Sequence, residues 1–136
     1  MPAKLYVGIK GVIFQAKKLL VLRREIPKQA AFWDLPGGRL EAEEDFTTGL
    51  KRELAEELPG LNSYRVGGLL GARKNLSRTS DGTELVILYY QIFATPFQVK
   101  ISSEHTGFDW LNLATVKTLP SPYNETYAKF FELAED

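Results

Sequence analysis

The feature that most constrains this chain is a short predicted helix whose apolar side also carries carboxylates. Helix signals run over residues 45–58, with Asp45 as the N-cap residue. On a helical wheel, one stripe holds Phe46, Gly49, Leu50, Leu54 and Leu58. Glu53 and Glu57 fall inside that stripe, and Glu56 falls at its edge. The face that should be buried therefore carries acids, which repel one another at this spacing.

A buried carboxylate without a partner is strongly disfavoured, so such acids are paired with a cation, protonated or bound to a metal ion. Between Glu41 and Glu57 the chain has seven acids but two bases, Lys51 and Arg52. Hard divalent cations prefer oxygen ligands, and Mg²⁺ or Mn²⁺ suits such a cluster. The competing interpretation is a solvated acidic face, with the helix rotated so that the glutamates lie at the rim of the core.

Strand signals dominate the rest of the chain. Residues rich in Val, Ile, Leu and aromatic side chains predict strands at 5–14, 18–25, 65–77 and 83–95, and a pair of short strands in 100–113. Asp81-Gly82 predicts a turn before the strand at 83–95. Asn112 is predicted to cap a short helix, and Ser121, followed by Pro122 at the first helical position, a final one. The element order predicts an α/β (α+β) fold with a mixed sheet, in a single domain covering 1–136.

Composition argues against several classes of function. The formal net charge is zero, so no overall field draws the chain to nucleic acid or to a membrane surface. Without cysteine there are no disulfides or thiolate metal sites, and the lone His105 is too little for a histidine-based zinc site. The longest apolar-rich run, 85–94, is too short to span a bilayer. Because the N-terminus lacks the features of a signal peptide, we expect a cytoplasmic protein.

The residues around the predicted helix match a known signature. Its fixed positions here are Gly38, then Glu44 after five residues, Arg52-Glu53-Leu54 after seven more, and Glu56-Glu57 after one. This pattern resembles the box of the Nudix hydrolases, G-x5-E-x7-R-E-U-x-E-E-x-G-U, where U is an aliphatic residue. Every fixed position through the paired glutamates matches.

The box, which runs from Gly38 to Gly60, departs from the family pattern at its end. Pro59 and Gly60 stand where the pattern has its glycine and aliphatic residue, as if one inserted residue had displaced Gly60 and Leu61 by one position. The segments RRE and FWDLPGG before the box and EHTGFDWLNL after it extend the resemblance over most of the chain. The resemblance implies a Nudix-type mixed β-sheet sandwiched between helices.

The resemblance also implies a metal site. Glu53, Glu56 and Glu57 would be the side-chain ligands, and the backbone carbonyl of Gly37 or Gly38 would join them. The implied cofactor is Mg²⁺, with Mn²⁺ as an alternative.

Two further roles follow from the resemblance. Glu44 and Arg52 would form a buried pair that orients the ligands, because an arginine fork can hold a carboxylate through two hydrogen bonds. The alternative for this arginine is a surface salt bridge of little value. The general base stays open between Glu53 or Glu56 inside the box and Glu104 on a later loop, which is otherwise an ordinary exposed acid. His105 is expected to be a loop or core residue.

Candidate substrate contacts lie before the box. Arg23 and Arg24 end a predicted strand and point to opposite faces, so at most one reaches a phosphate, and Arg24 is favoured. Phe32 and Trp33 flank the glycine turn and either stack on a base or belong to the core. The basic residues of the later hairpin, expected to be solvated, are Arg73, Lys74 and Arg78.

The expected function is that of a Mg²⁺-dependent pyrophosphohydrolase, which cleaves a nucleoside diphosphate linked to another moiety. A nucleoside triphosphate, including a damaged one, is the first expectation; ADP-ribose or a nucleotide sugar is the second. A non-catalytic domain that senses a nucleotide is the alternative from another class. Neither a nucleic-acid nor a membrane partner is expected. A homodimer stays open, because the run 85–94 either pairs across a dimer or fills a core.

Overall fold

The computed structural model describes residues 1–75, 79 and 81–136. Its strands are β1 (Leu5–Gln15), β2 (Lys18–Arg24), β3 (Phe32–Asp34), β4 (Gly37–Arg39), β5 (Tyr64–Lys74), β6 (Glu84–Ala94) and β7 (Gly107–Leu111). Its helices are α1 (Phe46–Glu57), α2 (Leu113–Val116) and α3 (Tyr123–Leu133). The strands form a mixed sheet in the order β3-β2-β1-β6-β5, with β4 paired to β1 and β7 paired to β2. β1 and β6 run parallel, whereas β1 and β2 form an antiparallel hairpin.

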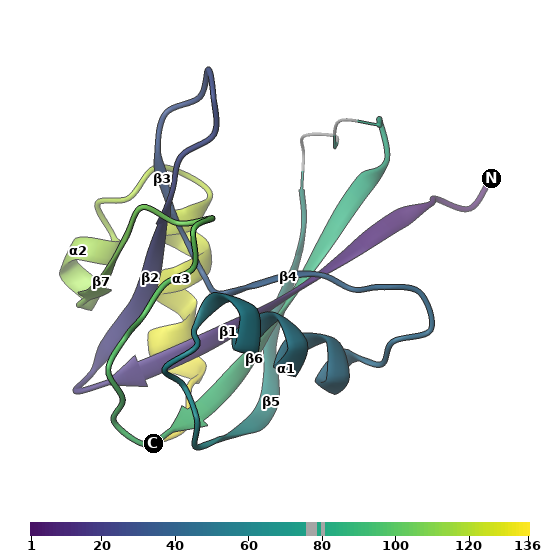
Figure 1. Ribbon diagram of the computed structural model, residues 1–136. Coiled ribbons are helices and arrows are strands. Elements are labelled where there is room, and N and C mark those ends of the chain that lie inside the picture. Colours follow the sequence, from purple (N-terminus) through teal and green to yellow (C-terminus); the bar gives the residue numbers. More distant parts are fainter. Residues whose placement is uncertain (76–78, 80) are drawn as a thin grey trace.

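Helices cover both sides of this sheet, as Figure 1 shows for α1 and α3. Leu54 of α1 shares one core with Ile13 of β1. Phe130 of α3 shares the other core with Val12, the neighbouring residue of β1. Side chains alternate between the two faces of a strand, so β1 contributes to both cores. This arrangement confirms the predicted mixed sheet between helices.

Helix α1 follows its sequence signals closely. The Asp45 side chain accepts a hydrogen bond of 2.7 Å from the backbone N–H of Thr48 and so caps the helix. Leu50, Leu54 and Leu58 are fully buried, as the wheel predicts. Phe46 is not, because the first turn lies at the margin of the core; its side chain is 45% exposed and its ring contacts Tyr90.

Two local predictions near the C-terminus are wrong. Residues 100–106 form a loop and not a strand, because the backbone N–H of Thr106 bonds to the carbonyl of Arg23 and only the following residues pair with β2. Ser121 does not cap α3. Pro122 is the N-cap residue, because the backbone N–H of Tyr123 already bonds to the Pro120 carbonyl at 3.0 Å. The predicted cap of α2 by Asn112 is confirmed.

Strand β6 lies inside the sheet. Its two edges are taken by β1 and β5, and its residues Tyr89 and Ile92 belong to opposite cores. The apolar run 85–94 therefore fills the interior and offers no free strand edge. Gly82 lies in the link before β6 with a positive φ of 83°, whereas Arg78 of the basic hairpin falls outside the described residues. Across the described ranges, no helix is long and apolar enough to cross a membrane.

Candidate active site

The last turns of α1 meet the glycine turn that leads into β4. Glu57 is 5% exposed, and its carboxylate Oε2 accepts a hydrogen bond of 2.8 Å from the backbone N–H of Gly37. The carboxylate of Glu53 lies directly against Gly38, where an added Cβ would stand 2.5 Å from it. Both acids of the apolar stripe therefore converge on the two glycines.

Gly37 is a glycine for a steric reason. Its φ of +141° is strained for any residue with a side chain. It pairs with Lys10 of β1, and a Cβ at this position would collide with the backbone carbonyl of Ile9. Strand β1 and the glycine turn can approach closely only because no side chain lies between them.

The surroundings of Glu57 favour the neutral form of its carboxyl group over the anion. Burial raises the pKa of this carboxyl to about 7, and the nearby acids Glu53 and Asp34 act in the same direction. The hydrogen bond from Gly37 and the charge of Lys10 act in the opposite direction. A buried carboxyl of this kind becomes favourable as an anion only when a further cation is close to it.

Lys10 is the buried cation of this region, and sequence reasoning did not single it out. Its Nζ lies 3.1 Å from Asp34 Oδ2 and 3.4 Å from the carbonyl oxygen of Gly37. Burial alone lowers the pKa of Lys10, but the carboxylates of Asp34 and Glu57 more than offset this, and the pKa is raised. The ammonium group is therefore charged inside the protein.

Arg52 and Glu44 form the expected two-bond contact. Nε of Arg52 donates to one carboxylate oxygen at 2.8 Å and Nη2 to the other at 3.0 Å. This contact is the main reason that the pKa of Glu44 falls to about 2. Nη1 of Arg52 also donates to Glu53 at 2.7 Å, so the arginine links the two acids. Its carboxylate partners hold the pKa of Arg52 above its usual value.

Glu56 does not join the other box acids. Its side chain is 60% exposed, and its carboxylate lies 3.7 Å from Arg52. Among the described residues, no three Asp, Glu, His or Cys side chains converge at metal-binding spacing. The structure thus brings Glu53 and Glu57 against Gly37 and Gly38 but leaves the third predicted carboxylate, Glu56, exposed to solvent.

This oxygen-rich donor set nevertheless fits a divalent cation. Carboxylate and carbonyl oxygens are the ligands of Mg²⁺ and Mn²⁺. The pKa of Glu57 is raised, first by its burial, so its surroundings would favour the anion more if a cation were bound beside it. The metal-ligand roles themselves stay predictions.

The two predicted arginines at the end of β2 contact different partners. Nη1 of Arg24 is 3.9 Å from Asp34 Oδ2, whereas Arg23 bonds to Thr106 on the far side of β2. The two arginines therefore diverge, as strand alternation predicts.

Phe32 and Trp33 occupy β3 and take different positions. Phe32 stacks on Tyr123 of α3 with ring centroids 5.7 Å apart. Trp33 packs against the core on the α3 side, and its carbonyl accepts a hydrogen bond of 3.1 Å from Tyr127 Oη. Together they line a pocket of about 240 Å³ with Ala31, Leu119, Pro120 and Tyr123. Phe32 is the better placed of the two for stacking on a ligand.

The loop that carries Glu104 and His105 packs at the end of β2. Glu104 is exposed, which agrees with the alternative that it is an ordinary loop acid. His105 is buried with Nδ1 unpartnered, and burial lowers its pKa while the charges of Asp34 and Lys10 reach it. Its burial agrees with the prediction of a loop or core histidine.

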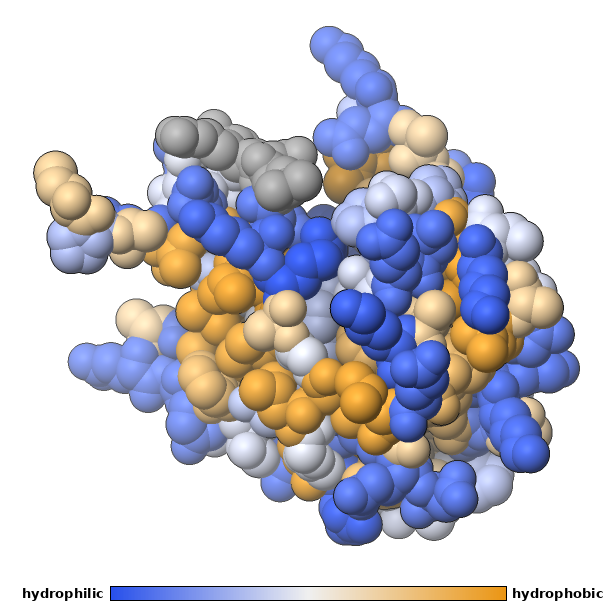
Figure 2. All heavy atoms as spheres, turned by 180° about the vertical axis from the view of Figure 1, so that it is seen from behind, coloured by the Kyte–Doolittle hydropathy of each residue, from blue (hydrophilic) through white to orange (hydrophobic). Residues whose placement is uncertain are grey.

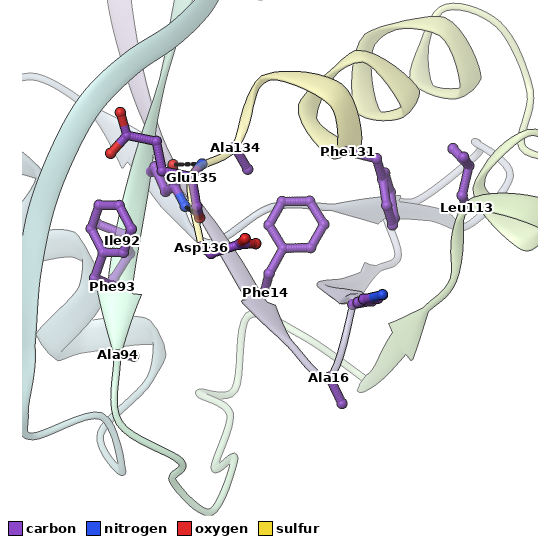
Figure 3. Close-up of a pocket in the computed structure, with 12 residues that line it drawn as sticks. Phe14, Ala16, Ile92, Phe93, Ala94, Leu113, Phe131, Ala134, Glu135 and Asp136 are labelled. Carbon is purple, nitrogen blue, oxygen red and sulfur yellow. Dashed lines mark hydrogen bonds between the residues drawn. The ribbon is translucent and has the colours of Figure 1, made fainter.

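Figure 2 shows the face of the molecule opposite to that of Figure 1, where apolar side chains form a band with hydrophilic side chains around it. A cavity of about 600 Å³ lies at the end of β1, where Figure 3 shows Phe14 and Phe131 facing one another. Its lining includes none of the α1 acids.

Comparison with solved structures supports the fold. The MutT protein from Methanosarcina mazei Go1 aligns with a TM-score of 0.78 at 24% identity, over 97% of this chain and 96% of that chain. A MutT NUDIX hydrolase from Burkholderia pseudomallei aligns with a TM-score of 0.70 at 25% identity, over 97% and 99%.

Comparison by sequence supports the family. A MutT-like protein from Streptomyces ambofaciens is 34% identical over 106 residues, which make up 77% of this chain. The match spans 62% of that relative, which is less than two thirds of its length. The NUDIX domain model matches residues 4–134. Because the domain model covers nearly the whole chain, this chain belongs to the NUDIX domain family.

Proposed function

We propose that this protein is a Mg²⁺-dependent pyrophosphohydrolase whose substrate is a nucleoside triphosphate, including damaged forms. The observation that carries the proposal is the convergence of Glu53 and Glu57 on Gly37 and Gly38, with Arg52 bonded to Glu53. Hydrolysis of a pyrophosphate bond requires neutralisation of phosphate oxygens and an oriented water. An acidic cluster fixed on a rigid helix and turn suits that requirement.

The metal would be held by Glu53, Glu57 and the Gly37 carbonyl, with Glu56 able to join from its exposed position. When bound, it neutralises phosphate charge and makes the attacking water more acidic. The side chains of the protein orient the ligands and accept the proton. Arg52 fixes the orientation of Glu53 through a 2.7 Å hydrogen bond. As the water oxygen bonds to phosphorus, a carboxylate accepts the proton of the water, the bond between phosphorus and the bridging oxygen breaks, and that oxygen leaves with the departing phosphate group.

Three carboxylates remain candidates for that proton. Glu53 is bonded to Arg52, Glu56 is exposed beside it, and Glu104 is exposed on the loop at the end of β2. The pH profile of kcat for the variants E53Q, E56Q and E104Q separates them. Loss of the acidic limb in one variant identifies the base, because that limb reports protonation of the group that must accept the proton.

The substrate's other parts would meet residues on β2 and β3. Arg24 is 45% exposed, so its guanidinium can reach a phosphate at the rim of the site. Phe32 offers a ring already stacked on Tyr123, on which a base could continue the stack.

The test is an activity screen with product analysis. The purified protein is incubated with nucleoside triphosphates, damaged triphosphates, ADP-ribose, nucleotide sugars and dinucleoside polyphosphates, with Mg²⁺, Mn²⁺ or EDTA. Mass spectrometry distinguishes release of pyrophosphate from release of two monophosphates. We expect metal-dependent cleavage of a triphosphate that is lost in E57Q and retained in the matched control E132Q, on the exposed face of α3.

Other outcomes identify the alternatives. Preferential cleavage of ADP-ribose or a nucleotide sugar would replace the triphosphate as substrate class. Tight nucleotide binding without turnover in either metal would indicate a sensor.

A further inference from the structure

Lys10 is an unusual residue for its place in the sheet. It lies on β1 between Ile9 and Gly11, both buried, and its own side chain is 11% exposed. It faces the core on the α3 side, because it alternates with Ile9 and shares a face with Val12. Lysine is almost never buried without a partner, and an apolar residue would fill this position at lower cost.

Asp34, the carboxylate partner of Lys10, also lies close to a second cation, Arg24. Asp34 Oδ2 lies 3.1 Å from Lys10 Nζ and 3.9 Å from Arg24 Nη1. One carboxylate oxygen thus lies between two positive charges, and the group of three carries a net positive charge. Exposure rises outward from Lys10 at 11% to Arg24 at 45%, so the cations lie at different depths.

This cationic group borders the acidic cluster directly. Lys10 Nζ is 3.4 Å from the carbonyl oxygen of Gly37, and the N–H of the same residue bonds to Glu57. The backbone of Gly37 therefore separates a cation from an acid. A polyphosphate chain that has one phosphate near the acids and their metal would have the next within reach of Lys10.

We propose that Lys10 binds a phosphate of the substrate and that Asp34 is a positioning residue, which neutralises Lys10 until the phosphate arrives. The assignment rests on the proposed function for the presence of a polyphosphate, but it concerns a strand residue outside the signature box. Lysine serves as a point charge for phosphate and does not need the geometry of an arginine fork. Arg24 and Lys10 would contact the polyphosphate in sequence from the rim inward.

A purely structural ion pair is the competing explanation. Such a pair would hold β1 to the end of β3, where Asp34 lies. Breaking it would destabilise the fold, because one buried charge would be left unpaired. It would not by itself change phosphate affinity in a protein that is still folded. The two explanations therefore differ in their effect on binding once stability is accounted for.

The experiment measures binding and not turnover. Isothermal titration calorimetry in EDTA follows inorganic tripolyphosphate and the α,β-imido analogue of whichever nucleotide wild type cleaves best. For K10M we expect affinity for both probes to fall about 10- to 100-fold, the range for a lost charge-assisted hydrogen bond. The matched control K129M removes one lysine charge from the exposed face of α3 and should change neither affinity.

Variants of Asp34 separate phosphate binding from folding. The double variant K10M/D34N removes both charges, so its melting temperature should recover relative to K10M. Its affinity for tripolyphosphate should stay as weak as that of K10M. D34N alone leaves Lys10 without its carboxylate and should bind tripolyphosphate at least as tightly as wild type. Recovery of affinity in the double variant would show that Lys10 acts only through the fold and overturn the assignment.

Binding of Mn²⁺ gives an independent readout by electron paramagnetic resonance. K10M should not weaken Mn²⁺ affinity, because it removes a positive charge from beside Gly37. The role of Lys10 would be rejected if the affinity of K10M for tripolyphosphate were within twofold of the wild-type affinity. It would also be rejected if wild type failed to bind tripolyphosphate at millimolar concentration. Absence of cleavage across the substrate screen would reject the proposed function. The role of Lys10 would still stand after that result if K10M loses the binding of tripolyphosphate that wild type shows.

Discussion

The backbone N–H of Gly37 and the carboxylate of Glu57 are joined by a hydrogen bond of 2.8 Å across 20 residues of sequence. It fixes the last turn of α1 to the start of β4, at the residues proposed to hold the metal. The bond is buried, so its geometry depends on the two elements and not on solvent. Substitutions on either side of it should separate effects on chemistry from effects on the fold.

Glu57→Gln should remove most of the activity while preserving the fold. The amide keeps an oxygen that can accept the hydrogen bond from Gly37, but it loses the charge that a metal needs. We expect kcat to fall by about 100-fold or more, beyond the 10- to 100-fold typical of residues that only support a ligand. Steady-state assays in Mg²⁺ measure the loss, and E132Q is the control.

The melting temperature of metal-free E57Q should not fall below that of metal-free wild type. Burial is the main cause that raises the pKa of Glu57 to about 7, so a neutral amide removes a desolvation cost. Thermal melts in EDTA followed by circular dichroism test this expectation. Near wild-type activity in E57Q would refute the metal-site assignment.

Alanine at the two neighbouring glycines should affect different properties, stability at Gly37 and activity at Gly38. In G37A the new Cβ meets the backbone of Ile9 and the residue must keep a φ of +141°, so we expect a loss of more than about 1 kcal/mol in the free energy of unfolding. In G38A the atoms nearest to the new Cβ are those of the Glu53 carboxylate, at the end of a side chain that can move. We expect G38A to unfold within about 1 kcal/mol of wild type and to lose activity because Glu53 is displaced.

Urea denaturation and kcat measured on the same two preparations decide this prediction. A G38A variant with full activity would mean that the position of Glu53 against the turn is irrelevant to catalysis. A G37A variant as stable as wild type would mean that the close approach to β1 can relax.

Local signals predicted the fold well where one pattern determined one element. The apolar runs that form β1 and β2, the Asp45 cap and the leucine stripe of α1 all appear as expected. The failures occur where tertiary contacts decide. Pro122 becomes the N-cap of α3 because the Pro120 carbonyl bonds the first helical residue, a contact that composition does not reveal.

The candidate site was predictable only in part. The wheel placed Glu53 and Glu57 on the apolar side, and their convergence on Gly37 and Gly38 agrees with it. Lys10 was missed, although a lysine within the apolar run 5–14 breaks the pattern of a strand buried on both faces. Its partner Asp34 comes from β3, and the pairing depends on sheet topology that no local pattern contains.

Leu54→Ala should destabilise the protein by about 2–5 kcal/mol, the usual range for a leucine truncated to a cavity in a core. Leu54 is 1% exposed, and its Cδ2 packs over Gly11 of β1. Urea denaturation measures the change, with K51A on the exposed face of α1 as the control. A loss below about 0.5 kcal/mol, the level of ordinary surface substitutions, would mean that α1 is oriented differently.

Arg52→Lys should impair catalysis although it keeps the positive charge. Arg52 bonds Glu44 through Nε and Nη2 and Glu53 through Nη1, and a lysine cannot reproduce this fork. Because Glu53 would lose its fixed orientation, we expect kcat to fall about 10- to 100-fold, as for other residues that orient metal ligands. Affinity for Mn²⁺, measured by electron paramagnetic resonance, should weaken in parallel.

A double-variant cycle tests whether this effect passes through Glu44. If the fork acts as a unit, E44Q and R52K should each lower kcat, and the double variant should lose little more than either alone. Circular dichroism melts of all three variants keep stability apart from chemistry. Full activity in R52K would mean that the contact is an ordinary surface salt bridge, as exposed pairs often are. Additive losses would mean that Arg52 and Glu44 act on the site separately, in spite of the two hydrogen bonds between them.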